Sequence, residues 1–143
     1  MSIIFSRKCE YALQAVSYLA LQPVGKKTSI RELTRNLKIP YHFLAKILQS
    51  LTYKKLLVSQ KGPSGGFALA LSPDKITLFH IVDAIDGSGF TNKCVMGFPE
   101  CSGKSPCAVH KHWAKMREGI YSMLVSENIA DMAKAMKRPE YRA

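Results

Sequence analysis

Three of the four cysteines in this chain lie in one short segment, and their thiolates could ligate a metal or take part in redox chemistry. They are Cys94, Cys101 and Cys107, with six and then five residues between them. Four glycines between positions 87 and 103, together with Pro99 and Pro106, argue against a regular helix or strand here. The sequence therefore predicts a loop that carries three thiols.

The spacing of these thiols bears on the metal that they could bind. Zinc sites commonly use Cys-x-x-Cys pairs, and the chain has none. The wider spacing favours an iron–sulfur cluster, which binds thiolates on a loop that solvent can reach. Zinc is the competing metal, and a thiol switch without metal is a third reading. A cluster would also need a fourth ligand from elsewhere in the chain.

The rest of the composition is that of an ordinary globular protein. Apolar residues form 47% of its 143 positions, and no run approaches the roughly 20 apolar residues that cross a bilayer. The charges of Arg7 and Lys8 follow a short apolar patch, which is the reverse of a secretory signal. We therefore expect a cytoplasmic protein with no membrane partner, where structural disulfides are disfavoured.

Positive charge is concentrated in the first half of the chain. Residues 1–72 hold eleven lysines and arginines but only two acids, a net charge of +9. Residues 73–143 hold ten and eight, a net charge of +2. This asymmetry is typical of a module that binds a polyanion, joined to a second element with another task. Composition alone is also compatible with a basic protein that its charge keeps soluble.

The basic half has the pattern of a helix-turn-helix. A first helix is expected over 6–22, where apolar residues recur at helical spacing. Ser29 and Glu32 form a capping-box pattern that opens a short helix. Another helix starts at Pro40, because proline is tolerated at the first helical position. Its buried face is expected to comprise Phe43, Leu44, Ile47, Leu48 and Leu51.

A β-hairpin follows these helices directly. Strand-like segments at 56–60 and 67–71 flank a basic, glycine-rich tip at 61–66. A hairpin in this position is the wing of a winged helix-turn-helix. The expected fold is therefore mainly helical (α+β), with a small β-hairpin wing.

The second half supplies further helices around the cysteine segment. Thr77 can cap a helix over 78–86, and a final short helix is expected over 128–137. Between them, Pro106 opens a long helix whose apolar residues repeat at spacings of four and three, which predicts a seam for a partner helix. The seam consists of Val109, Trp113, Met116, Ile120 and Met123.

Three parts are expected along the chain. Residues 1–86 form a winged helix-turn-helix DNA-binding domain, and residues 87–105 form a cysteine-rich, cluster-binding loop. Residues 106–143 form a dimerisation helix and a C-terminal helix.

Four blocks of sequence resemble one family of proteins. They are residues 6–13 (Ser-Arg-Lys-Cys-Glu-Tyr-Ala-Leu), residues 39–48, residues 61–67 (Lys-Gly-Pro-Ser-Gly-Gly-Phe), and the three cysteines with Cys107-Ala-Val-His110. In this order they are similar to the IscR/NsrR-type family of iron–sulfur-dependent winged-helix bacterial transcriptional regulators. The likeness covers residues 6 to about 134.

The resemblance implies a homodimer, held by its long helices, that binds double-stranded operator DNA. It also implies an iron–sulfur cluster on the cysteine loop, with 2Fe–2S expected ahead of 4Fe–4S. His110, one turn after Cys107, matches a family ligand position, and Glu10 matches an acidic ligand that other members supply across the dimer. Either could be the fourth ligand. Cys9 is expected to be a buried, apolar residue.

The resemblance and the motif together predict which residues contact DNA. Exposed residues near the start of the second motif helix face the major groove, the basic wing approaches a minor groove or phosphates, and the start of the first helix meets phosphates. For an isolated lysine or glutamine, a solvated surface is the alternative. The expected contacts are Ser6, Arg7, Lys8, Tyr41, His42, Lys46, Gln49, Lys61, Ser64 and Gly65.

The sequence thus predicts a dimeric DNA-binding regulator, expected to be a repressor. Its operator affinity would be set by a cluster that responds to redox state, nitric oxide or iron. The alternative is a winged-helix DNA-binding protein with zinc or free thiols and no iron sensing. A thiol oxidoreductase is disfavoured because the chain lacks both Cys-x-x-Cys and a nucleotide-binding glycine motif. We therefore expect no enzymatic activity.

Overall fold

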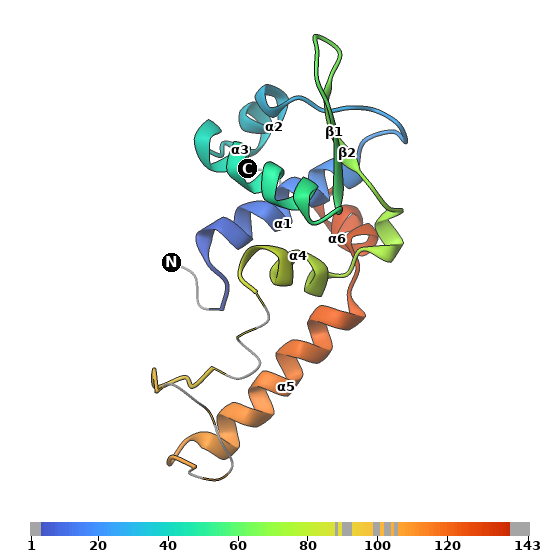
Figure 1. The fold of residues 1–143 in the computed structure, drawn as a ribbon. Coiled ribbons are helices and arrows are strands. Elements are labelled where there is room, and N and C mark those ends of the chain that lie inside the picture. The colour runs from blue at the N-terminus through green and yellow to red at the C-terminus, as the bar shows by residue number, and fades with distance from the viewer. Residues whose placement is uncertain are drawn as a thin grey trace.

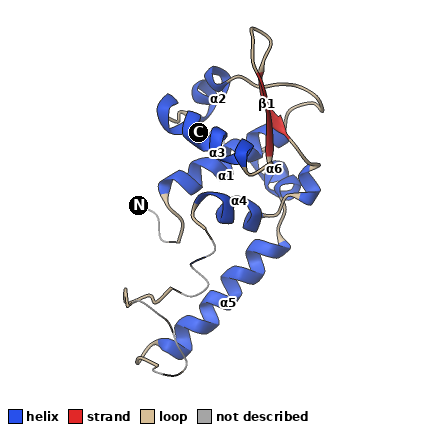
Figure 2. Ribbon diagram, viewed as in Figure 1, coloured by secondary structure: helices blue, strands red, loops and turns tan. Residues whose placement is uncertain are grey.

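Six α-helices and a two-stranded antiparallel sheet make up the part of the chain that the computed structural model describes, namely residues 4–87, 89, 93–98, 101, 104 and 106–137. The shorter helices and the sheet gather at one end of the molecule, and the long helix α5 (His110–Ser126) extends away from them (Figure 1). The fold is mainly helical with a small hairpin, so the predicted fold class is confirmed (Figure 2).

Helix α1 (Arg7–Ala20) lies at the centre of the short helices. Ser6 caps it, since its hydroxyl accepts a hydrogen bond from the backbone amide of Cys9 at 3.0 Å. The helix packs against α3, α4 and α6, which is why a whole side of it is buried. The buried residues are Cys9, Ala12, Ala15, Val16, Ser17 and Leu19.

Helix α2 (Ile30–Leu37) begins the helix-turn-helix. Ser29 caps it by accepting from the Glu32 amide at 3.1 Å, as the sequence pattern predicts. The Glu32 carboxylate, however, lies 3.5 Å from Lys26 Nζ, so this acid forms an ion pair with the preceding loop. Lys38 then adopts a left-handed conformation with φ of 56°, and the chain turns into the next helix.

Helix α3 (Tyr41–Tyr53) packs against α1 and α2 through Leu44, Ile47, Leu48 and Leu51. The prediction that Phe43 belongs to this buried face is wrong, because 56% of its surface is exposed. Its ring meets Tyr11 of α1 edge-on, with 6.4 Å between the ring centroids. At 3.6 residues per turn, Phe43 lies about 90° around the axis from the centre of the buried stripe. The spacing of apolar residues predicts where the buried stripe of α3 lies but not how many residues wide it is.

The wing consists of β1 (Leu57–Gln60) and β2 (Gly66–Leu69), paired in antiparallel register. The predicted strands are confirmed with shifts of one or two residues. Thr28 extends the sheet beside β2, since it exchanges two backbone hydrogen bonds with Phe67 at 2.9 and 2.8 Å. The hairpin tip projects beyond the helix-turn-helix (Figure 1).

Helices α4 (Leu78–Ile85) and α6 (Ile129–Met136) also pack against α1. Thr77 caps α4, and His80 completes a capping box, because its Nδ1 accepts from the Thr77 amide at 3.0 Å. The sequence groups the last helix with the dimerisation part. In space, α6 lies against α1 and the short helix η1 (Pro73–Lys75), which are elements of the first part.

The long helix α5 starts at His110 rather than at Pro106. The His110 amide closes a turn on the Cys107 carbonyl at 3.1 Å, and this turn precedes the helix. At its other end, Leu124 is fully buried and Tyr121 packs edge-on against Phe79 of α4, with 5.4 Å between the ring centroids. The N-terminal turns of α5 therefore lie away from the core.

The core is one continuous apolar cluster that involves α1 to α4, α6, the C-terminal part of α5 and the base of the wing. Its largest fully buried side chains include Leu33, Ile39, Leu44, Ile47, Leu48, Ile81 and Ile129. No helix in the described ranges is both long and apolar enough to cross a membrane.

Candidate functional site

The first candidate surface is the solvent-facing side of α3, the second helix of the motif. His42, Lys46 and Gln49 are all exposed there, and Tyr41, at the start of the helix, is 49% exposed. Within the described residues Lys46 pairs with no carboxylate. In helix-turn-helix proteins, the residues at the start of this helix read base edges. The side chains that the sequence predicts as α3 contacts are thus open to a ligand.

The wing tip presents a second exposed group of residues. Lys61 and Ser64 are exposed, whereas Gly65 is half-buried. A side chain on Gly65 would collide with the Gln60 carbonyl, and its amide already donates to Gly62 at 3.0 Å. The turn itself therefore requires this glycine, whether or not DNA approaches it. Of the predicted DNA contacts at the tip, Lys61 and Ser64 therefore have side chains exposed to solvent.

The start of α1 is the third surface, and its groups differ in availability. Arg7 and Lys8 are exposed, and Arg7 lies 3.8 Å from Glu10. Both donors of Ser6 are used: its amide and its hydroxyl donate to the Asp86 carboxylate at 2.9 and 2.5 Å. A carboxylate is favourable at this position because the start of a helix carries partial positive charge.

Cys9 lies fully buried beneath this carboxylate. Burial, followed by the nearby charges of Asp86 and Glu10, raises the pKa of the Cys9 thiol from 9.0 to about 12. The thiol is therefore neutral at physiological pH, which makes it a poor ligand and nucleophile. This agrees with the sequence-based expectation for Cys9.

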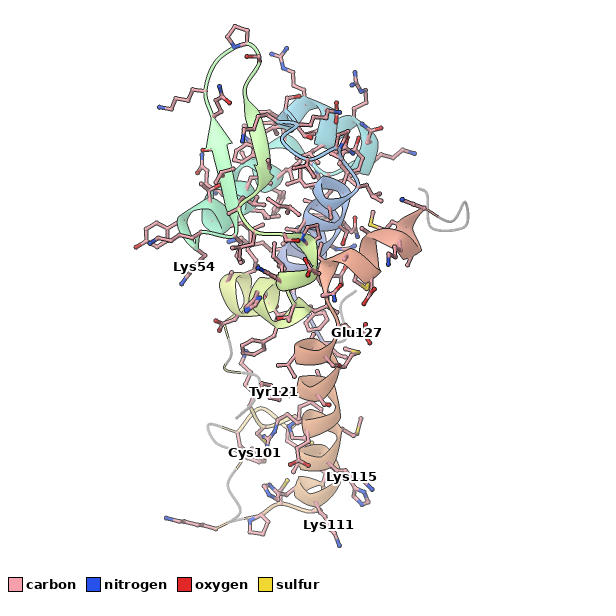
Figure 3. The ribbon with its side chains drawn as sticks, turned by 90° about the vertical axis from the view of Figure 1, so that its right-hand side faces the viewer. Lys54, Cys101, Lys111, Lys115, Tyr121 and Glu127 are labelled. Atoms are coloured by element: carbon pink, nitrogen blue, oxygen red, sulfur yellow. The ribbon has the colours of Figure 1, made fainter. Side chains whose placement is uncertain are left out.

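The cysteine loop (residues 87–109, between α4 and α5) carries the other three thiols. Cys101 Sγ lies 3.2 Å from Nδ1 of His110, the first residue of α5. Figure 3 shows Cys101 beside this helix. Cys94 is half-buried, and its sulfur accepts from the Met96 amide at 3.4 Å. Cys107 is exposed. In the described part of the chain, no three or more histidine, cysteine or acidic side chains gather into a metal site.

The donor set of the loop nevertheless suits an iron–sulfur cluster. Three thiols and one imidazole lie within residues 94–110, and Cys101 and His110 are already in contact. The thiols of Cys94 and Cys107 would need to approach that pair. The other candidate ligand, Glu10, lies on α1 and is engaged by Arg7.

The loop is also held to α5 through a backbone atom next to Cys94. The Lys93 carbonyl accepts from Trp113 Nε1 at 2.8 Å and from an Arg117 nitrogen at 3.3 Å. The segment that carries the first thiol is therefore attached to the helix that was predicted to form the dimer.

The predicted dimer seam on α5 is divided between two environments. Trp113 donates a hydrogen bond to the cysteine loop of the same chain, and Ile120 packs against the core. Met116 and Met123 are 61% and 43% exposed, and Val109 precedes the helix at 37%. Met116 and Met123 are thus the seam residues most available to a second copy.

Comparison with known families identifies the chain's lineage. The family model named Rrf2, described as an iron-dependent transcriptional regulator, matches residues 5–135. The chain belongs to the Rrf2 family. An Rrf2 protein of this fold is a DNA-binding transcriptional regulator and not an enzyme, as the sequence predicts.

Individual Rrf2-like relatives cover nearly the whole chain. A helix-turn-helix-type transcriptional regulator of Aquifex aeolicus is 35% identical over 132 residues, which is 91% of each chain. The regulator IscR of Aliivibrio salmonicida is 27% identical over 125 residues, or 87% of this chain and 74% of that one. The structure of CymR, the global cysteine regulator of B. subtilis, matches with a TM-score of 0.81 at 23% identity. It covers 94% of this chain and 98% of CymR.

Three contacts of this Rrf2 chain were not predicted from its sequence. One joins Ser6 to Asp86, and the other two join the Lys93 carbonyl to Trp113 and to Arg117, so each links the cysteine loop or its edge to a distant helix. Asp86 and Ser6 are 80 residues apart. A polar residue directly before Gly87 marks only a helix end, and no local pattern reveals its partner.

Proposed function

We propose that the chain is a homodimeric repressor whose operator affinity is set by the state of its cysteine loop, with an iron–sulfur cluster as the sensor. The observation that carries this proposal is the pair of hydrogen bonds from Ser6 to Asp86. Asp86 is the last residue before the loop, and Ser6 begins a helix whose first residues are basic and exposed.

On DNA, α3 would enter the major groove, and Lys46 and Gln49 would donate to base edges or phosphates. Lys61 at the wing tip would add a phosphate or minor-groove contact. Arg7 and Lys8 would meet phosphates beside the groove. The net charge of +9 over residues 1–72 supports a polyanion at this end of the protomer.

Cys94, Cys101 and Cys107 would supply the thiolate ligands, with His110 or Glu10 as the fourth. The contact between Cys101 and His110 supports His110 within one protomer. Glu10 would have to come from the partner of a dimer. When bound, a cluster supplies a centre that nitric oxide, oxidants or iron shortage can alter.

The chain's own residues would carry a change in the loop to the DNA-binding end. Ser6 cannot donate to a phosphate while Asp86 occupies both of its donors. A shift of the loop that moves Asp86 would change both the charge and the free donors at the start of α1. Because α1 packs against α3, it would also change how the recognition helix is presented.

The dimer would form along α5. Met116 and Met123 are exposed on one side of this helix, and Gly119 between them has no atom within 4 Å of an added Cβ. Small residues allow two helices to approach closely, and exposed methionines adapt to a partner surface. In this arrangement Trp113 would keep its contact with the loop of its own chain and would not form part of the dimer interface.

The experiment compares operator affinity between two states of the same protein. A duplex is first selected from random-sequence DNA by the full chain, purified without oxygen. Its affinity is then measured at one salt concentration for cluster-loaded and chelator-stripped protein, and sedimentation checks that both are dimers. We expect affinities that differ by about tenfold or more, which is a coupling free energy within the usual allosteric range. Equal affinities would contradict the proposal.

A cluster-free regulator is the second candidate, with either zinc or free thiols in the loop. It is favoured by the fact that only two of the proposed ligands are in contact among the described residues. A thiol beside an imidazole is also a common arrangement in oxidation-sensitive sites. Iron, sulfide and zinc analysis of anaerobically purified protein, with a visible spectrum, separates the two candidates. Zinc without iron or sulfide would support the second.

A further inference from the structure

Phe43, in the first turn of α3, is a large apolar side chain that the protomer leaves open. It is 56% exposed, whereas the next residue, Leu44, is fully buried. It does not line the core, and its only ring contact in the described part of the chain is with Tyr11. The fold therefore supports this ring on one side and presents the other to solvent.

The support beneath the ring orders it. The Tyr11 and Phe43 ring planes meet at 68° with 6.4 Å between centroids, an edge-to-face arrangement that aromatic pairs prefer. The Arg7 guanidinium lies 6.0 Å from the centre of the Tyr11 ring. Tyr11 thus connects the Phe43 ring to the basic start of α1.

The surroundings of Phe43 indicate what kind of partner it meets. His42 and Lys46 are its exposed neighbours on α3, and the exposed Arg7 lies over the Tyr11 ring that contacts it. An apolar ring within a basic surface is poorly matched to an apolar protein face, because docking there would desolvate the charges as well. It is well matched to DNA, which offers phosphates to the cations. DNA also carries one apolar group on the major-groove edge of its bases, the C5 methyl group of thymine.

We propose that Phe43 contacts a thymine methyl group in each half-site and so helps to determine which operator the protein selects. This inference rests on the proposed function, since it requires α3 to enter the major groove. It assigns a sequence-reading role to a side chain that makes no hydrogen bond. Lys46 and Gln49, by contrast, would act through donors.

The test is a cycle between one protein side chain and one DNA methyl group. The probe is a duplex selected from random-sequence DNA by the full-length wild-type dimer. Each thymine is replaced singly by deoxyuridine, which removes the methyl group and keeps every hydrogen-bonding atom. Affinity is measured at fixed salt for wild type, Phe43→Ala and Phe43→Leu.

The matched control is Tyr53→Ala. Tyr53 is an exposed aromatic residue, at 82%, on the same helix but at its opposite end. Circular dichroism tests whether each variant folds, and sedimentation tests whether it keeps the wild-type oligomeric state.

In each half-site, replacing one particular thymine by deoxyuridine should weaken binding by wild type about fourfold. This is the effect expected from losing one buried methyl group. Tyr53→Ala should keep that sensitivity. Phe43→Ala should bind more weakly and lose it, whereas Phe43→Leu should keep part of it. A contact with sugar or phosphate would weaken Phe43→Ala without any dependence on methyl groups.

Two results would overturn this inference alone. The first is salt-dependent binding in which the replacement of each thymine by deoxyuridine has the same effect on wild type and on Phe43→Ala. The second is a loss of the wild-type oligomeric state by Phe43→Ala in sedimentation, which would mean that the ring contacts a second copy. If wild type enriches no duplex at all, the proposed function fails together with it.

Discussion

The winged end and the cysteine loop of this protein are held in place by different kinds of interaction. At the winged end, α2, α3 and the hairpin share one apolar core, and the wing is fixed by close backbone packing at Gly65 and Gly66. Polar contacts attach the described part of the loop and its edge to α1 and α5, among them those of Asp86, Lys93 and Cys101. The winged end is therefore stabilised by the burial of apolar surface, whereas the described part of the loop is attached by polar contacts.

This difference suits a regulator whose reading surface is constant and whose input is variable. An intramolecular hydrogen bond contributes about 1 kcal/mol net, or about 1.5–3 kcal/mol when one partner is charged, so the proposed ligand or redox chemistry in the loop is comparable in size with the contacts that attach it. The apolar core beneath α3 is worth far more. A change in the loop should consequently move the winged end as a body rather than unfold it.

The largest effect is expected from Gly66→Ala at the rigid end. Gly66 has φ of 154°, and an added Cβ would collide with the Thr28 carbonyl, so the strand pairing beside β2 must shift. We expect a loss of about 2–3 kcal/mol in the free energy of unfolding, measured by urea titration. Ser64→Ala, at the exposed tip of the same hairpin, should leave that free energy unchanged. Equal stability of both variants would show that the wing is not held by this packing.

A smaller effect is expected from removing one charge at each end. Lys61→Ala should weaken operator binding roughly three- to tenfold. Log affinity falls with log salt, and this negative slope should become less steep by about 0.9 for each phosphate that Lys61 neutralises. Lys111→Ala makes the same charge change at the far end of α5 (Figure 3). It should change neither the operator affinity nor its dependence on salt. An unchanged slope for Lys61→Ala would mean that the wing does not touch phosphate.

The smallest perturbation uses the thiols themselves as probes. Cys9 is fully buried and its pKa is raised to about 12, whereas Cys107 is exposed. Alkylation of metal-free native protein near neutral pH should therefore label Cys107 quickly and Cys9 only after unfolding, as mass spectrometry would show. Fast native labelling of Cys9 would contradict its burial.

The same pKa shift has a consequence for stability. The stabilisation that comes from burying the neutral Cys9 thiol is fully present below pH 9 and is lost as the pH rises through about 12. Cys9→Ala should remove this part of the pH dependence of the unfolding free energy.

Most of the winged end could be predicted from the sequence because its determinants are local. The cap at Ser29, the buried stripe of α3 and the hairpin around 61–66 all lie within a few residues of what they specify. Phe43 is the exception: an apolar residue at the edge of a stripe has no local signal that tells burial from exposure.

The attachments of the loop could not be predicted, for the opposite reason. Ser6 and Asp86 join across 80 residues, and Trp113 reaches Lys93 across 20. The apolar period of α5 marks Trp113 and Ile120 as seam residues without saying whose surface they meet. Such choices depend on the folded arrangement and not on neighbouring sequence.

The loop is proposed to communicate with the winged end through Asp86. The ratio between the operator affinities of cluster-loaded and stripped protein tests this link most directly. Operator affinity is measured for cluster-loaded and stripped protein in wild type, in Asp86→Ala and in Asp83→Ala, which removes an exposed acid from the same helix. We expect a ratio of about tenfold or more in wild type and in Asp83→Ala, and a ratio close to one in Asp86→Ala. A ratio that Asp86→Ala leaves at the wild-type value would contradict the link.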